Sequence, residues 1–153
     1  MKIRTIALTV VVMFVGLSFA AASPNMGTWK LNEAKSKLAP GAAKNSTVVY
    51  EAAGDSVKCT IDGTDSQGKP THIVWTGKFD GKDYPLTGDP NADTRSYKTI
   101  DDRTTEGITK KSGKVTSTTR IVVAADGKSR TVTSDGTDST GKKTHVVAVY
   151  DKQ

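Results

Sequence analysis

Residues 63–72 read GTDSQGKPTH and residues 136–145 read GTDSTGKKTH, so eight of ten positions are identical at an offset of 73. In each copy an aspartate is followed three residues later by a glycine. That pattern is typical of a three-residue hairpin loop whose glycine takes the left-handed conformation. The repeat therefore predicts the same β-hairpin twice. Because turn chemistry alone needs fewer identities, we favour a duplicated hairpin unit over two independent solutions of one turn.

The loop sets the pairing of the strands on either side of it. If Asp65 pairs with Lys69, the apolar residues fall together on one face, and a slip of one residue would separate them. The predicted pairs on this face are Val57–Gly77, Cys59–Trp75 and Ile61–Ile73. The predicted pairs on the opposite face include Asp62–His72 and, in the second copy, Asp135–His145. We expect the first face to point into the core.

The rest of the chain is rich in Thr, Val and Ser and is interrupted by glycine-containing turns every 8 to 12 residues, which is typical of an antiparallel sandwich or barrel. The predicted strands are 26–31, 46–52, 56–64, 70–79, 83–87, 94–100, 103–111, 114–124, 129–137 and 143–150. Helix signals are limited to one short candidate near 32–38, before Ala39-Pro40-Gly41. We predict an all-β fold, an up-and-down meander closed into a barrel of about 8–10 strands.

The N-terminus carries the pattern of an export signal. Lys2 and Arg4 precede an apolar run over 6–19, and small residues at 20–22 predict cleavage before Ser23. The apolar run is short for a membrane-spanning helix, and no later stretch is long enough to span. We expect residues 1–22 to be a signal peptide, residues 23–153 to form one domain, and the mature protein to be secreted or periplasmic.

Charge and cysteine content exclude several classes of function. Removing Lys2 and Arg4 lowers the formal net charge from +6 to +4, and the remaining basic residues are interspersed with acidic ones, so we expect no nucleic-acid partner. Cys59 is the only cysteine and lies on the apolar side of an alternating strand pattern. We interpret it as core packing, with pairing to another chain as the alternative. The two histidines provide too few ligands for a zinc site, and we expect no metal and no cofactor.

Gly27-Thr28-Trp29 opens the first predicted strand and resembles the Gly-x-Trp start of lipocalins and fatty-acid-binding proteins. The chain as a whole resembles small exported bacterial lipocalin-like proteins. The stretches that carry this wider resemblance are 27–32, 79–85 and 149–153. The resemblance implies that Trp29 closes one end of a barrel with a basic side chain across it, for which Arg120 and Lys30 are both candidates. Residues 32–45 leave no room for the two lid helices of fatty-acid-binding proteins.

Three functions remain open from the sequence. The first is binding of a small apolar or amphipathic ligand inside the barrel, without catalysis. The inward residues that would line such a site are Trp75, Ile73, Ile61, Val57 and Phe79. The second is an interaction or structural module of the cell envelope or the extracellular space, with a filled core. The third is an enzyme built on the two Asp–His pairs, although we favour an exposed charge pair across two strands as the explanation of these residues.

Overall fold

The computed structural model describes residues 23–138 and 140–153. The predicted signal peptide, residues 1–22, lies outside this part of the chain. The strands are β1 (Gly27–Leu31), β2 (Lys44–Ala53), β3 (Ser56–Thr64), β4 (Pro70–Gly77), β5 (Tyr84–Thr87), β6 (Thr94–Thr99), β7 (Thr104–Lys111), β8 (Lys114–Val123), β9 (Ser129–Thr137) and β10 (Lys143–Lys152). All ten predicted strands are present, and their bounds agree to within two residues.

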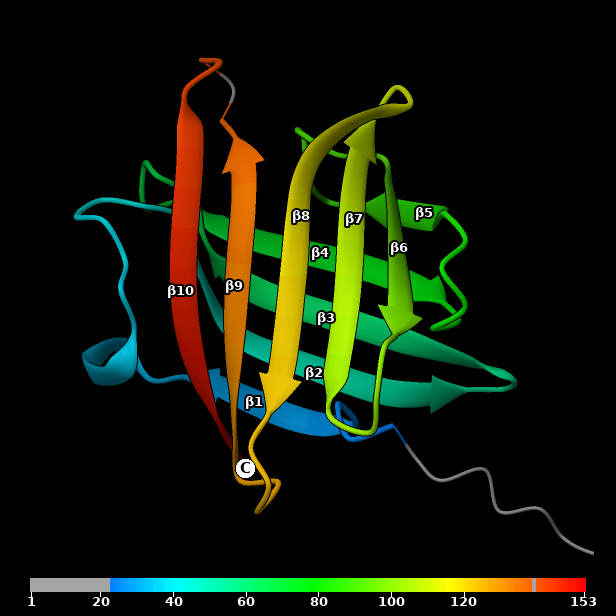
Figure 1. Ribbon diagram of the computed structural model, residues 1–153. Helices are drawn as coiled ribbons and strands as arrows, with labels where there is room; N and C mark the ends of the chain where they lie inside the picture. Colours follow the sequence, from blue (N-terminus) through cyan, green and yellow to red (C-terminus); the bar gives the residue numbers. More distant parts are fainter. Residues whose placement is uncertain (1–22, 139) are drawn as a thin grey trace, which may run out of the picture.

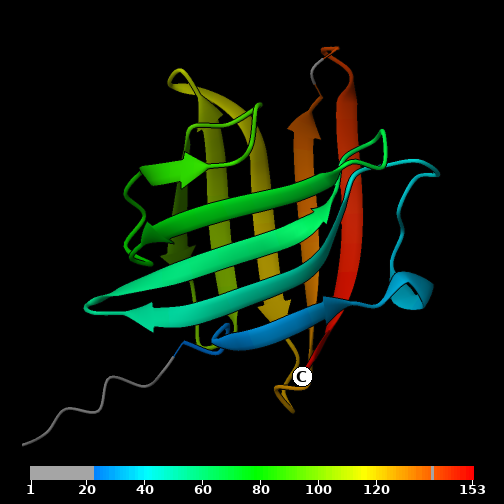
Figure 2. The same ribbon diagram turned by 180° about the vertical axis from the view of Figure 1, so that it is seen from behind.

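The ten strands form one closed antiparallel barrel in which each strand pairs with its neighbours in the sequence. β1 closes the barrel, because Trp29 pairs with Val48 of β2 on one side and with Lys152 of β10 on the other. β2 to β4 cross β7 to β10 at a large angle, so the barrel is a pair of crossed layers (Figure 1, Figure 2). Closure gives every strand a neighbour on each side, and the shortest pairings are those of β5, which pairs with β4 at Val74–Thr87 and Trp75–Leu86. The predicted fold class is confirmed.

The two repeated hairpins pair in the predicted register. Ile61 opposes Ile73 in the first hairpin, and Asp135 opposes His145 in the second. In the first loop the Asp65 carboxylate accepts hydrogen bonds from the backbone N–H groups of Gln67 and Lys69, at 2.8 and 2.9 Å. Gly68 has φ +77°, which is the left-handed conformation that the spacing predicts.

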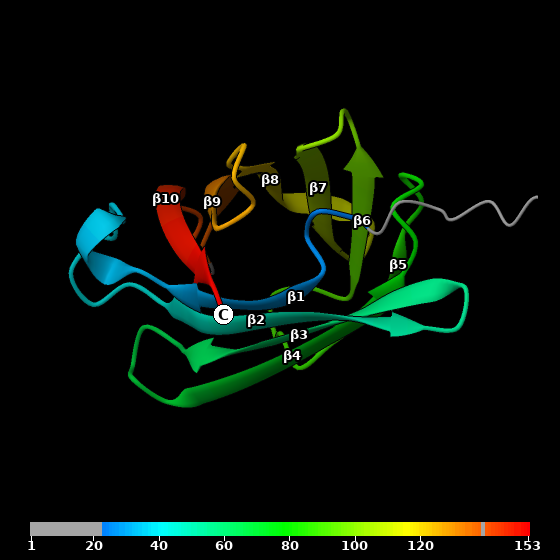
Figure 3. The same ribbon diagram turned by 90° about the horizontal axis from the view of Figure 1, so that it is seen from below.

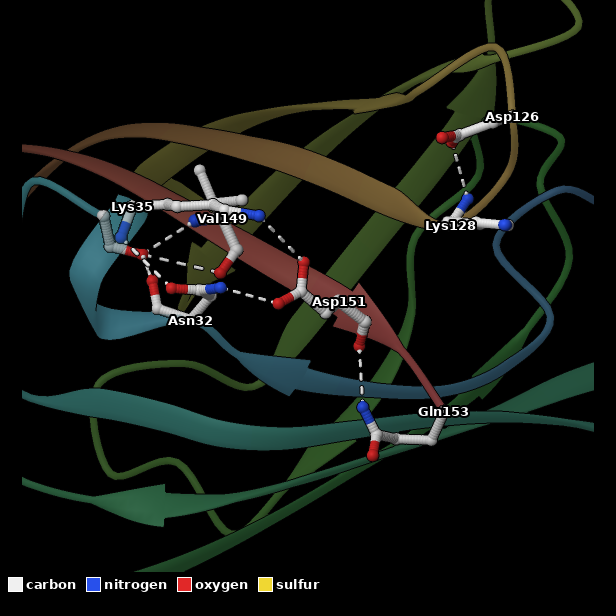
Figure 4. Close-up of polar contacts among 8 residues, drawn as sticks. Asn32, Lys35, Asp126, Lys128, Val149, Asp151 and Gln153 are labelled. Atoms are coloured by element: carbon white, nitrogen blue, oxygen red, sulfur yellow. Dashed lines mark hydrogen bonds and ion pairs between the residues drawn. The ribbon is translucent and has the colours of Figure 1, made fainter.

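The candidate helix near 32–38 is a single 3-10 turn, η1, at Glu33–Lys35. Its bonds tie it to β10: Asn32 Nδ2 donates to Asp151 Oδ2 at 2.6 Å, and Ser36 Oγ accepts from the backbone N–H of Val149 at 2.9 Å (Figure 4). Lys35 Nζ lies 3.7 Å from Asp151 Oδ1. The turn therefore lies against the outside of the barrel instead of covering an opening.

The two crossed layers face each other in the view from below (Figure 3), and the buried side chains of the core come from strands of both layers. At one end of the barrel, β1 passes beneath the upright strands in Figure 1 and carries Trp29, which is completely buried. We call this end the floor. The β9–β10 hairpin turns at the other end, which we call the mouth. The buried apolar core consists of Trp29, Val48, Tyr50, Cys59, Ile61, Trp75, Leu86, Ala92, Tyr97, Ile121, Val123, Ala148 and Tyr150.

Candidate functional site

The barrel contains a cavity of about 180 Å³, which we call the inner chamber. A second hollow of about 520 Å³, the mouth chamber, lies at the end where the repeated hairpins turn. The two chambers meet at Asn45, Arg95 and Ser117, which line both of them. The other residues that line the inner chamber are Val48, Tyr50, Ile61, Tyr97, Thr119, Ile121, Arg130, Val132, Ser134 and Tyr150.

The inner chamber has a mixed lining. β2 and β3 contribute the apolar side chains of Val48 and Ile61. On β8 and β9, alternation turns hydroxyl groups inward, and Thr119 Oγ1 and Ser134 Oγ are hydrogen-bonded across the strands at 3.0 Å. A molecule in this chamber would therefore meet an apolar surface and hydrogen-bonding groups together.

Arg95 lies where the two chambers meet. Its position on β6 is opposite Thr109 on β7, and its Nε donates to Thr109 Oγ1 at 3.0 Å. The backbone carbonyl of Arg95 accepts from Trp75 Nε1 at 2.8 Å, which links β6 to the fully buried Trp75. Among the described residues, Arg95 takes part in no ion pair. Its Nη groups are therefore not held by a carboxylate.

Arg130 forms the base of the inner chamber and is 2% exposed. Its guanidinium carbon lies 4.7 Å from the ring centre of Trp29, 5.1 Å from that of Tyr150 and 5.2 Å from that of Tyr50. Aromatic faces attract a cation, and more so in the absence of water. One Nη group lies 3.5 Å from Asn25 Oδ1, and the buried Nε has no hydrogen-bond partner.

Arg130 and Lys152 are the basic residues that lie across Trp29, with Lys152 Nζ 5.2 Å from its ring centre. Neither residue proposed from the sequence takes this position. Arg120 points outward and pairs with Glu106 at 2.6 Å, and Lys30 is exposed. Residues at alternate positions of β9 share a face, so the inward position of Val132 also turns Arg130 inward.

The structure separates the five ligand-lining residues proposed from the sequence. Ile61 lines the inner chamber and Ile73 lines the mouth chamber. Trp75 and Phe79 lie in an aromatic cluster with Tyr97, with ring centres 4.9 to 6.0 Å apart. Val57 packs against the core. The residues that sequence reasoning missed are the inward polar ones, above all Arg95 and Arg130.

Both Asp–His pairs lie on the outer face of the barrel. His72 Nδ1 is 2.6 Å from Asp62 Oδ1, and His145 Nδ1 is 2.7 Å from Asp135 Oδ1. All four side chains are more than half exposed. Within 23–138 and 140–153, no group of three or more His, Cys, Asp or Glu side chains is placed to hold a metal ion. An exposed pair of this kind contributes a few tenths of a kcal/mol to stability.

The buried tyrosines remain neutral around Arg130. Burial raises the pKa of Tyr150 to about 12 and raises that of Tyr50 well above its ordinary value. Loss of a proton would create a charge in a site from which water is excluded. Neither phenol therefore offsets the positive charge of the guanidinium at neutral pH.

Cys59 is expected to resist thiol reagents in the native protein. Its side chain is fully buried, and burial raises its pKa to about 11. About one thiol in a thousand is then ionised at pH 8, and the thiolate is the reactive form. Labelling with a disulfide reagent at pH 8 should be negligible in buffer and stoichiometric in denaturant. Stoichiometric labelling of the folded protein would contradict this.

No protein-family model matches the sequence, and no curated protein is significantly similar to it. The residues that the structure describes include no helix that is both long and apolar enough to cross a membrane. The barrel topology is compatible with a lipocalin-like or fatty-acid-binding-protein-like fold.

Proposed function

We propose that this protein binds a small amphipathic molecule inside its barrel and does not transform it. The observation that carries the proposal is the inner chamber of about 180 Å³, which shares the lining residues Arg95, Asn45 and Ser117 with the mouth chamber. Binding sites for small molecules are concave, and a few polar groups in an apolar lining set the ligand's orientation. The lining combines Val48 and Ile61 with inward hydroxyl groups.

The proposal favours an amphipathic ligand over a purely apolar one. A hydrocarbon would leave inward polar groups such as Ser117 and the buried Arg130 Nε facing it without a partner. The alternative, an interaction module with a filled core, is less well supported because the inner chamber is lined but not filled by side chains. The signal-like segment at 1–22 supports action outside the cytoplasm, as a secreted or periplasmic protein.

Native mass spectrometry of the mature protein, purified without denaturation from expressing cells, tests the proposal. We expect a complex that is heavier than the chain by one defined small mass. The variant Ser134→Phe places a ring in the inner chamber and should remove that extra mass. Thr133→Phe on the outer face of the same strand is the matched control and should keep it.

The two variants must both remain folded by far-UV circular dichroism for the comparison to count. Retention of the same molecule by Ser134→Phe would contradict binding in the inner chamber. A wild-type protein with no added mass and no affinity for small amphipathic molecules would contradict the proposal as a whole and favour the interaction module.

A further inference from the structure

We infer that the ligand is a compact organic anion and that Arg95 binds its anionic group at the junction of the two chambers. Arg130 supplies a second positive charge from the base of the inner chamber. The inference rests on the proposed function and adds to it the charge class of the ligand and the residue that recognises it.

The ionised side chains that line the inner chamber are all positive. Arg95 and Arg130 both line the inner chamber, and no carboxylate lines it. Within the described residues, neither arginine forms an ion pair. Charges removed from water are usually paired with an opposite charge. Both guanidinium groups contact aromatic rings but no carboxylate, and together they favour an anion within the cavity that they face.

The two arginines also supply hydrogen-bond donors. A guanidinium has five N–H donors and no acceptor. Arg95 uses its Nε on Thr109, and its guanidinium carbon lies 6.0 Å from the ring centre of Tyr97. Among the described residues, no carboxylate holds its Nη groups. Arg130 has one long contact to Asn25 and a buried Nε without a partner. Buried donors without partners are rare, and an acceptor that enters the chamber is one explanation.

Ionisable groups beside the two arginines could offset their positive charge if they lost a proton. The hydroxyls of Tyr50 and Tyr150 lie in a site where burial holds them protonated, so they are neutral at pH 7. The Cys59 thiol is also held neutral by burial. These two phenols and the thiol thus add no negative charge at pH 7, and low-dielectric walls concentrate the field of the two guanidinium groups in the chamber.

The size of the chamber limits the ligand. A volume of about 180 Å³ equals that of about six water molecules at ~30 Å³ each. It holds a carboxylate, sulfonate or phosphate group and a few further atoms, and the remaining body would extend into the mouth chamber. The planar fork of arginine binds a carboxylate or phosphate through two parallel hydrogen bonds. Ile61 and Val48 offer an apolar contact for the attached carbon atoms.

Isothermal titration calorimetry at pH 7 can test the charge requirement with matched probes. Hexanoate and benzoate are compared with hexanamide and benzamide, which have nearly the same shape and no charge. We expect both carboxylates to bind at least about tenfold more tightly than their amides, because a charged acceptor is the stronger partner for a guanidinium. Equal affinities for carboxylate and amide would overturn the anion inference and leave the ligand-binding barrel intact.

The residue assignment is tested with Arg95→Gln and with Arg120→Gln as its control. Both variants lose one positive charge, but Arg120 lies on the outer face in an ion pair with Glu106. We expect Arg95→Gln to weaken carboxylate binding by about thirtyfold, or about 2 kcal/mol, and to leave amide binding unchanged. Arg120→Gln should bind all four probes like the wild type. Equal losses in the two variants would remove Arg95 from the site.

Two further outcomes are decisive. A small molecule retained by the native protein should be an anion at pH 7, and a neutral retained molecule would overturn the inference even if the proposed function holds. If the protein retains nothing and binds none of the four probes, both proposals fail together.

Arg95→Lys keeps the positive charge but lacks the planar fork of the guanidinium. We expect its affinity for the carboxylates to lie between those of the wild type and Arg95→Gln.

Discussion

Replacing Trp29 by alanine is expected to lower the free energy of unfolding by about 3–5 kcal/mol. The indole is completely buried at the floor of the barrel, and its Nε1 donates to the backbone carbonyl of Asn25 at 2.7 Å. The Arg130 guanidinium carbon and Lys152 Nζ both lie over its ring, 4.7 and 5.2 Å from the ring centre. Alanine would leave a cavity beside a buried guanidinium and remove its aromatic contact.

The position of Trp29 in the topology adds to this effect. Its strand closes the barrel between β2 and β10, so loosening it exposes the edges of both neighbours. Urea unfolding followed by far-UV circular dichroism measures the loss without relying on tryptophan fluorescence. The matched control is Val115→Ala, because Val115 is 57% exposed and its loss should change stability by no more than about 0.5 kcal/mol. A loss of less than about 1 kcal/mol in Trp29→Ala would show that the floor is not a major source of stability.

Local signals explain why the strands and hairpins were predictable. The Asp65 loop combines an aspartate that accepts backbone N–H groups with a glycine at φ +77°, and both requirements are visible in the sequence. Apolar alternation in β3 then selects one register, in which Ile61 opposes Ile73. Turn chemistry and hydrophobic pattern act over a few residues, so no knowledge of the distant chain was needed.

The chambers were not predictable because they depend on contacts between distant strands. Ser, Thr and Arg on alternate positions of β8 and β9 look like ordinary solvent-facing residues, and only closure of the barrel shows which of them point inward. Arg130 meets Trp29, more than 100 positions away in the chain. Alternation along β9 puts Arg130 on the same face as Val132, two residues later, so this pattern was a signal for an inward cation. The predicted register turned Trp75 and Phe79 inward, and the structure places both in the aromatic cluster with Tyr97.

Substituting Gly63 by valine is expected to cost about 2–3 kcal/mol or more, because a side chain there would meet backbone rather than open space. A Cβ at this position would collide with the Lys44 carbonyl and lie 3.0 Å from Asn45 Cα. The opposing strand, β2, shifts its register between Asn45 and Thr47 at the same place. β2 would have to move away from β3, and the lining of both chambers at Asn45 would move with it.

The second copy of the repeat provides another test of whether a glycine is needed where two strands approach closely. Gly136 occupies the equivalent position, and a Cβ there would lie 2.9 Å from both Ser117 Cβ and the Thr116 carbonyl. Gly136→Val should therefore also destabilise the protein, but by less, because Ser117 contributes a side-chain atom that can move. Thr71→Val, at the cross-strand partner of Gly63, is the control and should unfold at nearly the wild-type urea concentration. If Gly63→Val unfolds at the same urea concentration as this control, the first glycine of the repeat is not required for the close approach of the strands. If both glycine variants are destabilised in the expected order, the duplicated segment encodes close packing against a neighbouring strand as well as a turn.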